Sequence, residues 1–242
     1  PAVGITDHGN MHGAYEMWST AVKEGVKPII GIEAYVTPET ARQDQTRVSW
    51  DTNWNPDIDP QHRRRNPNDV SGGGLITHLT MWAETDEGLV NLMKASTDAN
   101  LEGRVMRYPR MDKEILAKYS KGIIASSGCP SGIIQTRLLL GQFDEALRAA
   151  GELQDIFGRD NFYIEFMDHG LKIEKQVTDG LLDIAKKLNA PLLATNDSHY
   201  VRAEDAGSQD AMLCINSGST LDEPGRFKFD GTGYYLKSAE EM

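Results

Sequence analysis

The sequence predicts an α/β fold built on a mainly parallel sheet. Short apolar runs alternate with amphipathic helical patterns along most of the chain, and this alternation is typical of barrels and of doubly wound sheets. Side chains that can bind metals lie in or directly after most of the apolar runs. In both architectures the loops after the carboxyl ends of the strands form the active face. We therefore expect these side chains to meet at one rim.

The elements follow in order along the chain. Helical spacing of Met11, Tyr15, Trp18 and Val22 predicts the first helix, and Thr85 is a suitable N-cap for a later one. Six strands are expected, at residues 2–6, 29–36, 75–83, 122–128, 162–167 and 191–195. Helices are expected near residues 11–23, after Thr85, and near residues 143–157 and 173–188.

Residues 37–74 differ from this pattern and predict a long polar loop inserted in the domain. The segment holds four prolines, the basic run Arg63–Arg65 and the triple glycine at 72–74, all typical of loops. The arginines could contact a phosphate backbone. A solvated basic run without a specific partner is the alternative.

Composition limits the class of protein. The 242 residues carry a formal net charge of -11, which argues against broad basic surfaces for nucleic acid. Divalent cations in a carboxylate-lined cleft would reverse the local sign, so a nucleic-acid substrate stays open. No apolar run reaches the roughly 20 residues of a membrane span, and two cysteines suit a reducing cytoplasm. The first and last residues indicate a piece of a longer chain.

The candidate metal ligands share a position at or near strand ends. Each has an ordinary structural alternative, such as a hydrogen-bonded core histidine or a buried carboxylate with its own donors. All of these placements together favour a metal site. Imidazole, carboxylate and thiolate ligands favour Zn, and they also fit Mn or Fe. The candidates are His8, Glu33, His78, Cys129, Asp197 and His199.

Five segments carry a family resemblance in this order: "GITDHGNMHGA", "KPIIGIEAYV", "THLTMWAET", "SSGCPSG" and "ATNDSHY". They resemble the PHP (polymerase and histidinol phosphatase) domain, in the actinobacterial-like form that begins the alpha subunit of bacterial DNA polymerase III. The resemblance implies a distorted (β/α)7 barrel of parallel strands, with up to three divalent ions at its C-terminal rim. Nine residues hold these ions in the family, and six carry over to the candidate ligands above. The other three, including an earlier His-x-His strand, are not present in this sequence.

The resemblance also divides the chain, and the places of three further residues beside His8 or near the rim suggest catalytic roles for them. Residues 1–218 match the PHP domain without its first strand, and residues 219–242 resemble the segment leading toward the polymerase palm. Asp7 is expected to orient an imidazole or accept backbone donors, while Glu165 and His169 are expected to orient water or DNA. Ordinary loop polarity is the alternative for Glu165 and His169. His12 and His62 are interpreted as non-functional.

Cys129 precedes Pro130, a residue suited to the first turn of a helix. We therefore expect the thiol to lie at a helix N-terminus, where its pKa would be lowered.

Three functions remain open. The first is a proofreading 3'–5' exonuclease domain of a replicative polymerase in the cytoplasm. Its partners would be the 3' end of a DNA primer-template, the polymerase core of the same chain and other replisome subunits such as the sliding clamp, with no membrane. The second is a free-standing phosphatase of small phosphomonoesters, and the third a non-catalytic scaffold. Six retained ligands weigh against the scaffold, and the polymerase-like tail weighs against the phosphatase, so the first is favoured.

Overall fold

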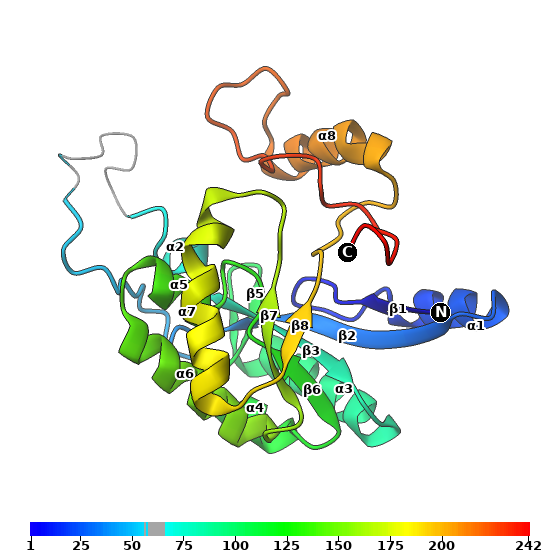
Figure 1. Cartoon of the computed structure of the whole chain (residues 1–242), viewed down its shortest axis with the longest axis horizontal. Helices are drawn as coiled ribbons and strands as arrows, with labels where there is room; N and C mark the ends of the chain where they lie inside the picture. Colours follow the sequence, from blue (N-terminus) through cyan, green and yellow to red (C-terminus); the bar gives the residue numbers. More distant parts are fainter. Residues whose placement is uncertain (56, 58–65) are drawn as a thin grey trace.

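The fold is organised around one eight-stranded mixed sheet with helices packed against it (Figure 1). The computed structural model describes residues 1–55, 57 and 66–242. The strand order is β4-β5-β2-β3-β6-β7-β8, and β1 pairs with β2 outside this path. The strands are β1 Ala2–Ile5, β2 Lys27–Val36, β3 Thr77–Ala83, β4 Arg104–Val105, β5 Tyr108–Met111, β6 Ile123–Ser126, β7 Phe162–Phe166 and β8 Leu192–Ala194.

The six expected strands are confirmed as β1, β2, β3, β6, β7 and β8, but the expectation that all strands are parallel is wrong. Strand β3 runs antiparallel to both of its neighbours, β2 and β6, and β4 runs antiparallel to β5. The remaining pairs are parallel, so β1, β2, β5, β6, β7 and β8 share one direction. Within the described residues no backbone pairing joins β8 to β1 or β4. The closed barrel therefore stays a prediction.

The helices follow the expected places, with several additional short ones. Helix α6 has the expected bounds, α7 begins one residue early, and the Thr85 side chain accepts a hydrogen bond from Gly88 N to cap α3. Segments α4 and α8 were not expected, α5 begins three residues after the helix start expected at Pro130, and Gly72 and Gly73 in the short α2 have left-handed backbone angles. The bounds are α1 Ala14–Lys23, α2 Ser71–Gly74, α3 Asp86–Glu102, α4 Lys113–Tyr119, α5 Ile133–Leu139, α6 Phe143–Phe157, α7 Lys172–Leu188, α8 Ala206–Ser217 and the 3-10 helix η2 Ala203–Asp205.

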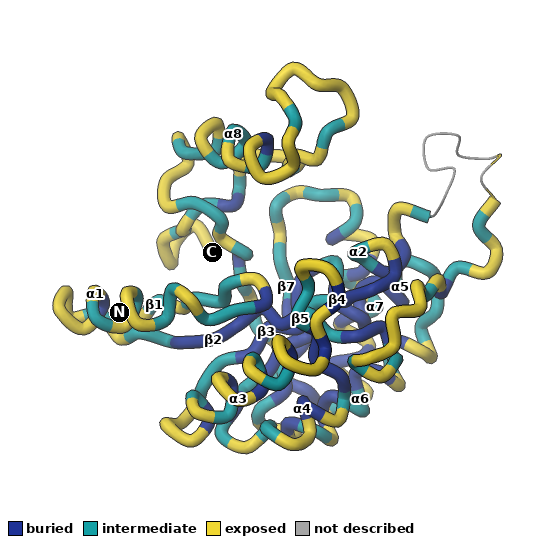
Figure 2. The backbone as a smooth tube through the Cα atoms, turned by 180° about the vertical axis from the view of Figure 1, so that it is seen from behind, coloured by how far each residue is buried: buried dark blue, intermediate teal, exposed yellow. Residues whose placement is uncertain are grey.

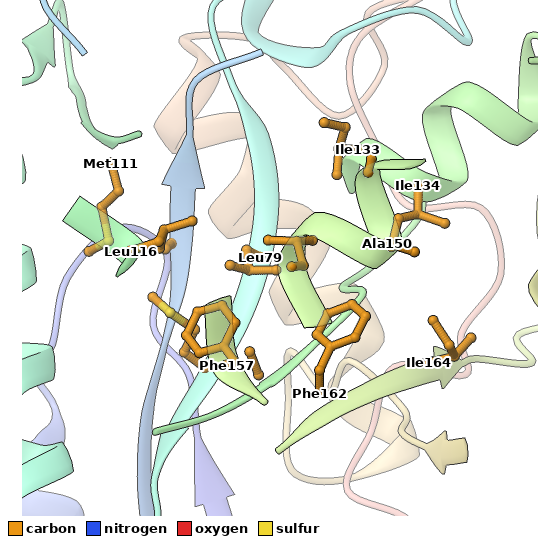
Figure 3. Packing of buried hydrophobic residues seen from close by; sticks show 14 of the residues in the cluster. Leu79, Met111, Leu116, Ile133, Ile134, Ala150, Phe157, Phe162 and Ile164 are labelled. Carbon is orange, nitrogen blue, oxygen red and sulfur yellow. The ribbon is translucent and has the colours of Figure 1, made fainter. Parts of the chain in front are cut away.

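The main core lies between the central strands and helices α3 to α7, where apolar side chains from sheet and helices interdigitate (Figure 3). Phe162 of β7 and Ile134 of α5 are completely buried. Burying a side chain of this size contributes about 1.5–3 kcal/mol. Figure 2 shows the central strands as the most buried part of the chain. This core fixes the strand ends that carry the candidate ligands.

Helix α1 does not bury the apolar face that its spacing suggested. Tyr15 and Trp18 are 76% and 48% exposed, and Ala21 is the buried residue of the helix. The helix also begins at Ala14, three residues after the expected start, because residues 9–13 form a turn that leads away from β1. Periodicity alone therefore located the helix but did not show what its apolar face contacts.

The described parts of the 37–74 loop are tied to the body at defined points. Trp50 is buried, and the guanidinium of Arg137 lies 3.8 Å from the centre of its ring. The Val48 amide donates to Gly74 O, which anchors the loop next to the start of β3. His62 and the arginines at 63–65 lie outside the described residues.

Glu39, near the start of this loop, lies at the centre of a charged network. Its carboxylate accepts hydrogen bonds from Arg137 and Arg148. Burial raises the pKa of Glu39, but the two guanidinium groups outweigh burial and lower it below its ordinary value. A carboxylate with a lowered folded-state pKa stabilises the protein above its unfolded pKa, and this contribution is lost as the pH falls through the folded-state pKa.

We expect the variant Glu39→Gln to lower the free energy of unfolding by about 1–2 kcal/mol at pH 7, an estimate discounted for the partly exposed Arg148. The deficit should shrink as the pH drops below the ordinary carboxyl pKa of 4.5. Urea unfolding at several pH values measures this, with the exposed Glu240→Gln as control. A deficit that does not change with pH would show that the loss is not electrostatic.

The C-terminal segment returns to the body after the exposed helix α8 (Figure 1). Tyr234 is buried, and its carbonyl accepts the backbone N–H of His199.

Among the described residues, no helix combines the length and hydropathy of a membrane span.

Candidate metal centre

The loop after β1 continues along the edge of β2 and places His8 beside Glu33. The Glu33 amide donates to Asp7 O at 3.0 Å, and the Gly9 amide donates to Glu33 O at 2.8 Å. These two backbone bonds hold His8 opposite Glu33, and His8 Nδ1 contacts Glu33 Oε2. Asp7 accepts the Gly13 amide at 3.0 Å, which fixes the turn before α1. Asp7 thus receives a backbone donor, one of its two expected roles.

His78 reaches the same rim because β3 is antiparallel. It is the second residue of β3, so it lies at the amino end of that strand, next to the carboxyl ends of the parallel neighbours. His78 Nδ1 lies 3.2 Å from Glu33 Oε1. The sequence placed His78 correctly at the rim, although it assumed the wrong strand direction.

Cys129 joins this group through the loop after β6. The His78 amide donates to Ser131 O at 3.0 Å, and Cys129 Sγ lies 3.3 Å from His78 Nδ1. The side-chain amide of Gln135 donates to Ser127 Oγ and Gly128 O, which braces the same loop. The turn that carries the thiol is therefore held from both sides.

The expected helix N-terminus at Cys129 is wrong. Helix α5 begins at Ile133 after the N-cap Gly132, so Pro130 lies in the preceding turn. Burial, together with the charges of Glu33 and Asp197, raises the pKa of the Cys129 thiol well above its ordinary value. Without a bound cation, the surroundings of the thiol favour its neutral form.

Asp197 and His199 approach from the loop after β8. His199 lies next to His8, with ring centres 5.7 Å apart, and its Nε2 is 3.3 Å from Asp197 Oδ1. Asp197 has a φ of 41°, in the left-handed region that residues with side chains seldom adopt. The structure thus brings all six candidate ligands into one chain of contacts.

The donors at the centre of this group fit a divalent cation. Ligand atoms of His8, Glu33 and His78 lie within 4.8 Å of one another. Glu33 is 4% exposed. Its Oε2 makes no hydrogen bond of ordinary geometry among the described residues, and His8 contacts it closely. Two nitrogens, a carboxylate and a nearby sulfur are ligands that Zn, Mn and Fe accept.

The charges of the group are coupled. Burial raises the pKa of Glu33, but hydrogen bonds from His78 and His8 outweigh burial, and the net effect lowers it far below its ordinary value. The hydrogen bond to Glu33 raises the pKa of His8 against the opposing effect of burial. A buried carboxylate that stays ionised between two imidazoles is a strong cation ligand.

Glu165, expected to orient water or DNA, is engaged within the protein. It is 3% exposed and accepts hydrogen bonds from Ser126 Oγ, Gly128 N and Thr195 Oγ1. Burial raises its pKa. The carboxylate links the loop after β6 to the loop after β8, so in this structure it positions the loops that carry Cys129 and Asp197.

His169 is engaged in a similar way. Its Nε2 donates to Asn196 O at 2.9 Å, its Nδ1 contacts a Glu174 oxygen, and its ring stacks on Tyr234 at 4.1 Å. Both ring nitrogens therefore have partners within the protein. These contacts fix Asn196, directly before Asp197. For both residues a direct role in catalysis stays a prediction, and the observed contacts describe positioning.

Three aromatic residues near the group were not predicted. Tyr35 lies beside His8 and His78, 6.3 Å and 5.5 Å from their ring centres, and Phe229 meets His199 at 4.6 Å. Tyr234 lies 6.1 Å from His199. Tyr35 could have been found because it lies two residues after Glu33 and therefore on the same face of the strand. No local pattern brings residues 229 and 234 to this site.

A glycine permits the close approach of Tyr35. Gly9 has a φ of +67°, and a Cβ there would lie 2.5 Å from Tyr35 Cε2. Gly25 is a matched control, because it has a φ of +70° with open space around its Cβ position.

We expect Gly25→Ala to cost about 1–2 kcal/mol of unfolding free energy through backbone strain alone. Gly9→Ala should cost about 1–3 kcal/mol more because Tyr35 must move, and it should weaken zinc binding. Thermal unfolding and zinc titration of both variants measure the difference. Equal effects of the two substitutions would mean that the Gly9–Tyr35 contact does not support the site.

Comparisons with known proteins agree with the geometry. The PHP domain family model matches residues 1–169. Over all 242 residues the chain is 53% identical to the DNA polymerase III subunit alpha of Mycobacterium tuberculosis and covers 20% of that protein. It is 54% identical to the subunit of Saccharopolyspora erythraea, of which it covers 20%, and 39% identical to that of Thermus aquaticus, of which it covers 18%. The chain spans about a fifth of the length of these curated relatives. Because the family model covers well over half of it, the chain belongs to the PHP domain family.

Proposed function

We propose that this chain is the PHP domain of a DNA polymerase III alpha subunit and acts in DNA replication as a metal-dependent 3'–5' proofreading exonuclease. One observation supports the proposal: the six candidate ligands, from loops and strands far apart in sequence, are linked by contacts around His8, Glu33 and His78, whose ligand atoms lie within 4.8 Å of one another. Similarity to alpha subunits along the whole chain supports the polymerase context. Residues 1–218 would form the domain, and residues 219–242 would lead toward the palm.

The ligand set suggests how ions would be held. His8, Glu33 and His78 could share one ion, and Glu33 could bridge two because its oxygens face different histidines. Cys129, Asp197 and His199 would complete the set, for up to three divalent ions. Zn fits these ligands best, and Mn or Fe also fit. Cys129 must lose its proton to bind, so zinc affinity should rise with pH.

Bound divalent ions would supply hydroxide at neutral pH and neutralise charge on the phosphoester. The protein's part is to hold the ligands. Glu165 fixes the loops of Cys129 and Asp197, and His169 fixes Asn196. Asp7 fixes the turn after His8. Asp197 adds a negative charge beside His199 and His8.

The proposal includes the partners that such a domain needs. These are the 3' end of a DNA primer-template, the polymerase core and other replisome subunits such as the sliding clamp. Two free cysteines, both buried, are consistent with a reducing cytoplasm.

A non-catalytic scaffold is the second candidate, and one observation favours it. The same contacts that gather the ligands tie β1, β2, β3 and the loop after β6 together. A bound ion would therefore stabilise the fold whether or not it acts in hydrolysis.

The test uses the intact protein and a primer-template with a mispaired 3' end. Zinc- or manganese-loaded protein should release the terminal nucleotide, and it should remove a mispaired end faster than a paired one. Loss of a single nucleotide from the 3' end is resolved on a sequencing gel. Intact, metal-loaded protein that leaves both primers uncut would exclude the exonuclease and favour the scaffold.

A further inference from the structure

A groove extends from the candidate metal centre. His8 is the one candidate ligand among the residues that line it. The groove has a volume of about 450 Å³ and begins at His8, which places it within the range of small-ligand sites, roughly 300–1,000 Å³. Its other walls come from the turn after β1, from α3 and from the β4–β5 hairpin. We call it the arginine groove, after its residues Arg104 and Arg107.

The two arginines face the groove from a hairpin that the sequence did not predict. Met106 at its turn has a φ of 54°. Arg107 donates to Tyr108 Oη at 3.3 Å, and Arg104 donates only a long hydrogen bond to Met106 O at 3.4 Å. Strand β5 pairs with the end of β2, and so the hairpin lies beside Tyr35.

Neither arginine has a carboxylate partner among the residues that the structure describes. This contrasts with Arg42, Arg148 and Arg226, each of which pairs with at least one acid. The groove lining contains no aspartate or glutamate at all. In a chain with a net charge of -11, two exposed guanidinium groups without a carboxylate partner beside a metal-ligand cluster suit a polyanion.

The groove also has surfaces that suit bases. Tyr35 lines the groove and lies nearly parallel to His8, while Tyr108 packs edge to face behind it at 5.1 Å and does not line the groove. Met93, 49% exposed, provides an apolar patch on the α3 wall. Aromatic rings interleaved with arginines are typical of single-strand nucleic-acid sites. A small phosphomonoester that carries an amine would find no acid here to bind its cation.

We infer that the arginine groove binds the single-stranded 3'-terminal segment of DNA, with Arg104 and Arg107 on its backbone phosphates and Tyr35 beside a base. This inference rests on the proposed function for the identity of the substrate. It adds the residues that would direct a strand toward the metal centre, and none of them is a metal ligand.

The kinetic test compares Arg104→Ala, Arg107→Ala and the double variant in the intact protein. Arg159→Ala is the matched control, since Arg159 is exposed and lies just before β7, at the opposite rim. For a metal-loaded enzyme acting on single-stranded oligothymidylate, the double variant should raise KM at least about tenfold and change kcat little. Hydrolysis of the small diester bis(p-nitrophenyl) phosphate should stay as in the wild type. Unchanged KM in the double variant would overturn the inference.

An equilibrium measurement separates this inference from the proposed function, because it needs no hydrolysis. The probe is a fluorescein-labelled phosphorothioate oligothymidylate, followed by anisotropy at several salt concentrations. Each lost phosphate contact should reduce the slope of log K against log salt by about 0.7. Arg104→Lys and Arg107→Lys should retain the wild-type slope. If DNA is never hydrolysed but the slope falls as expected, the exonuclease fails and the groove stands. If the slope of the double variant equals that of Arg159→Ala, the groove fails.

Discussion

The variant Glu33→Gln will lose divalent metal and hydrolytic activity together. Glu33 is buried between His8 and His78, and its carboxylate contacts both rings. The amide keeps the shape of the side chain but removes the charge that offsets a divalent ion and one of the two acceptor oxygens. Mutating groups that only orient metal ligands typically costs 10–100-fold. A central ligand should therefore cost more than about 100-fold in kcat/KM.

Elemental analysis and nuclease assays on the same sample measure both losses. Asp197→Asn, from the loop after β8, should show the same joint loss if the two loops share one site. Asp183→Asn, exposed on α7, makes the same change of carboxylate to amide and should change neither quantity. Wild-type exonuclease activity in Glu33→Gln protein that contains no metal would refute the assignment.

Removing the metal will lower the melting temperature of the domain. The candidate ligands come from β2, β3 and the loops after β1, β6 and β8, so an ion would link segments distant in sequence. A ligand present at 100 times its Kd stabilises the folded state by about 2.7 kcal/mol. For a domain of this size each kcal/mol shifts the melting temperature by roughly 2–4 °C. A decrease of about 5–11 °C is therefore expected.

Calorimetry of the intact protein before and after prolonged chelation measures this shift, with metal content followed by elemental analysis. Added zinc should restore the original transition, and added calcium should restore less, because calcium prefers oxygen ligands. A transition that stays at the same temperature after complete metal removal would show that the ions do not stabilise the fold. The role of the site would then be hydrolysis alone.

The strands near the candidate ligands could be predicted from sequence because each is an apolar run with a residue that can bind a metal in it or shortly after it. Strand direction could not, because β2 and β3 are joined by a long loop whose length fits either direction. His78 shows the consequence: its position near the start of the run at 75–83 is compatible with the shared rim only if that strand is antiparallel. An unusual placement of this kind is itself a signal of strand direction.

Local sequence patterns could not predict the β4–β5 hairpin or the path of the C-terminal segment. Strand β4 has two residues and β5 has four, one of them Pro109, which is too short for alternation to be read. Arg110 lies three residues after Arg107 in the sequence. Unlike the two groove arginines, it is fully buried and donates to backbone carbonyls. The sequence alone does not show that Arg110 is buried and Arg107 is exposed. The packing of Tyr234 on His169 likewise depends on a return of the chain that only the fold defines.

The pKa of Cys129 is set by burial and nearby charges and not by a helix N-terminus. The sequence placed the thiol at a helix N-terminus, yet two further residues separate Cys129 from the N-cap Gly132. Burial near Glu33 and Asp197 then dominates its electrostatics. Metal binding by Cys129 stays a prediction, and its position in the sequence did not predict the acidity of the thiol.

Anomalous diffraction tests the central claim most directly. Crystals of the intact protein loaded with zinc would be measured on both sides of the zinc absorption edge. We expect an anomalous peak about 2.0–2.2 Å from the ligand atoms of His8, Glu33 and His78, with any further peaks next to Cys129, Asp197 and His199. Zinc bound at full stoichiometry in solution but located away from Glu33 would contradict it.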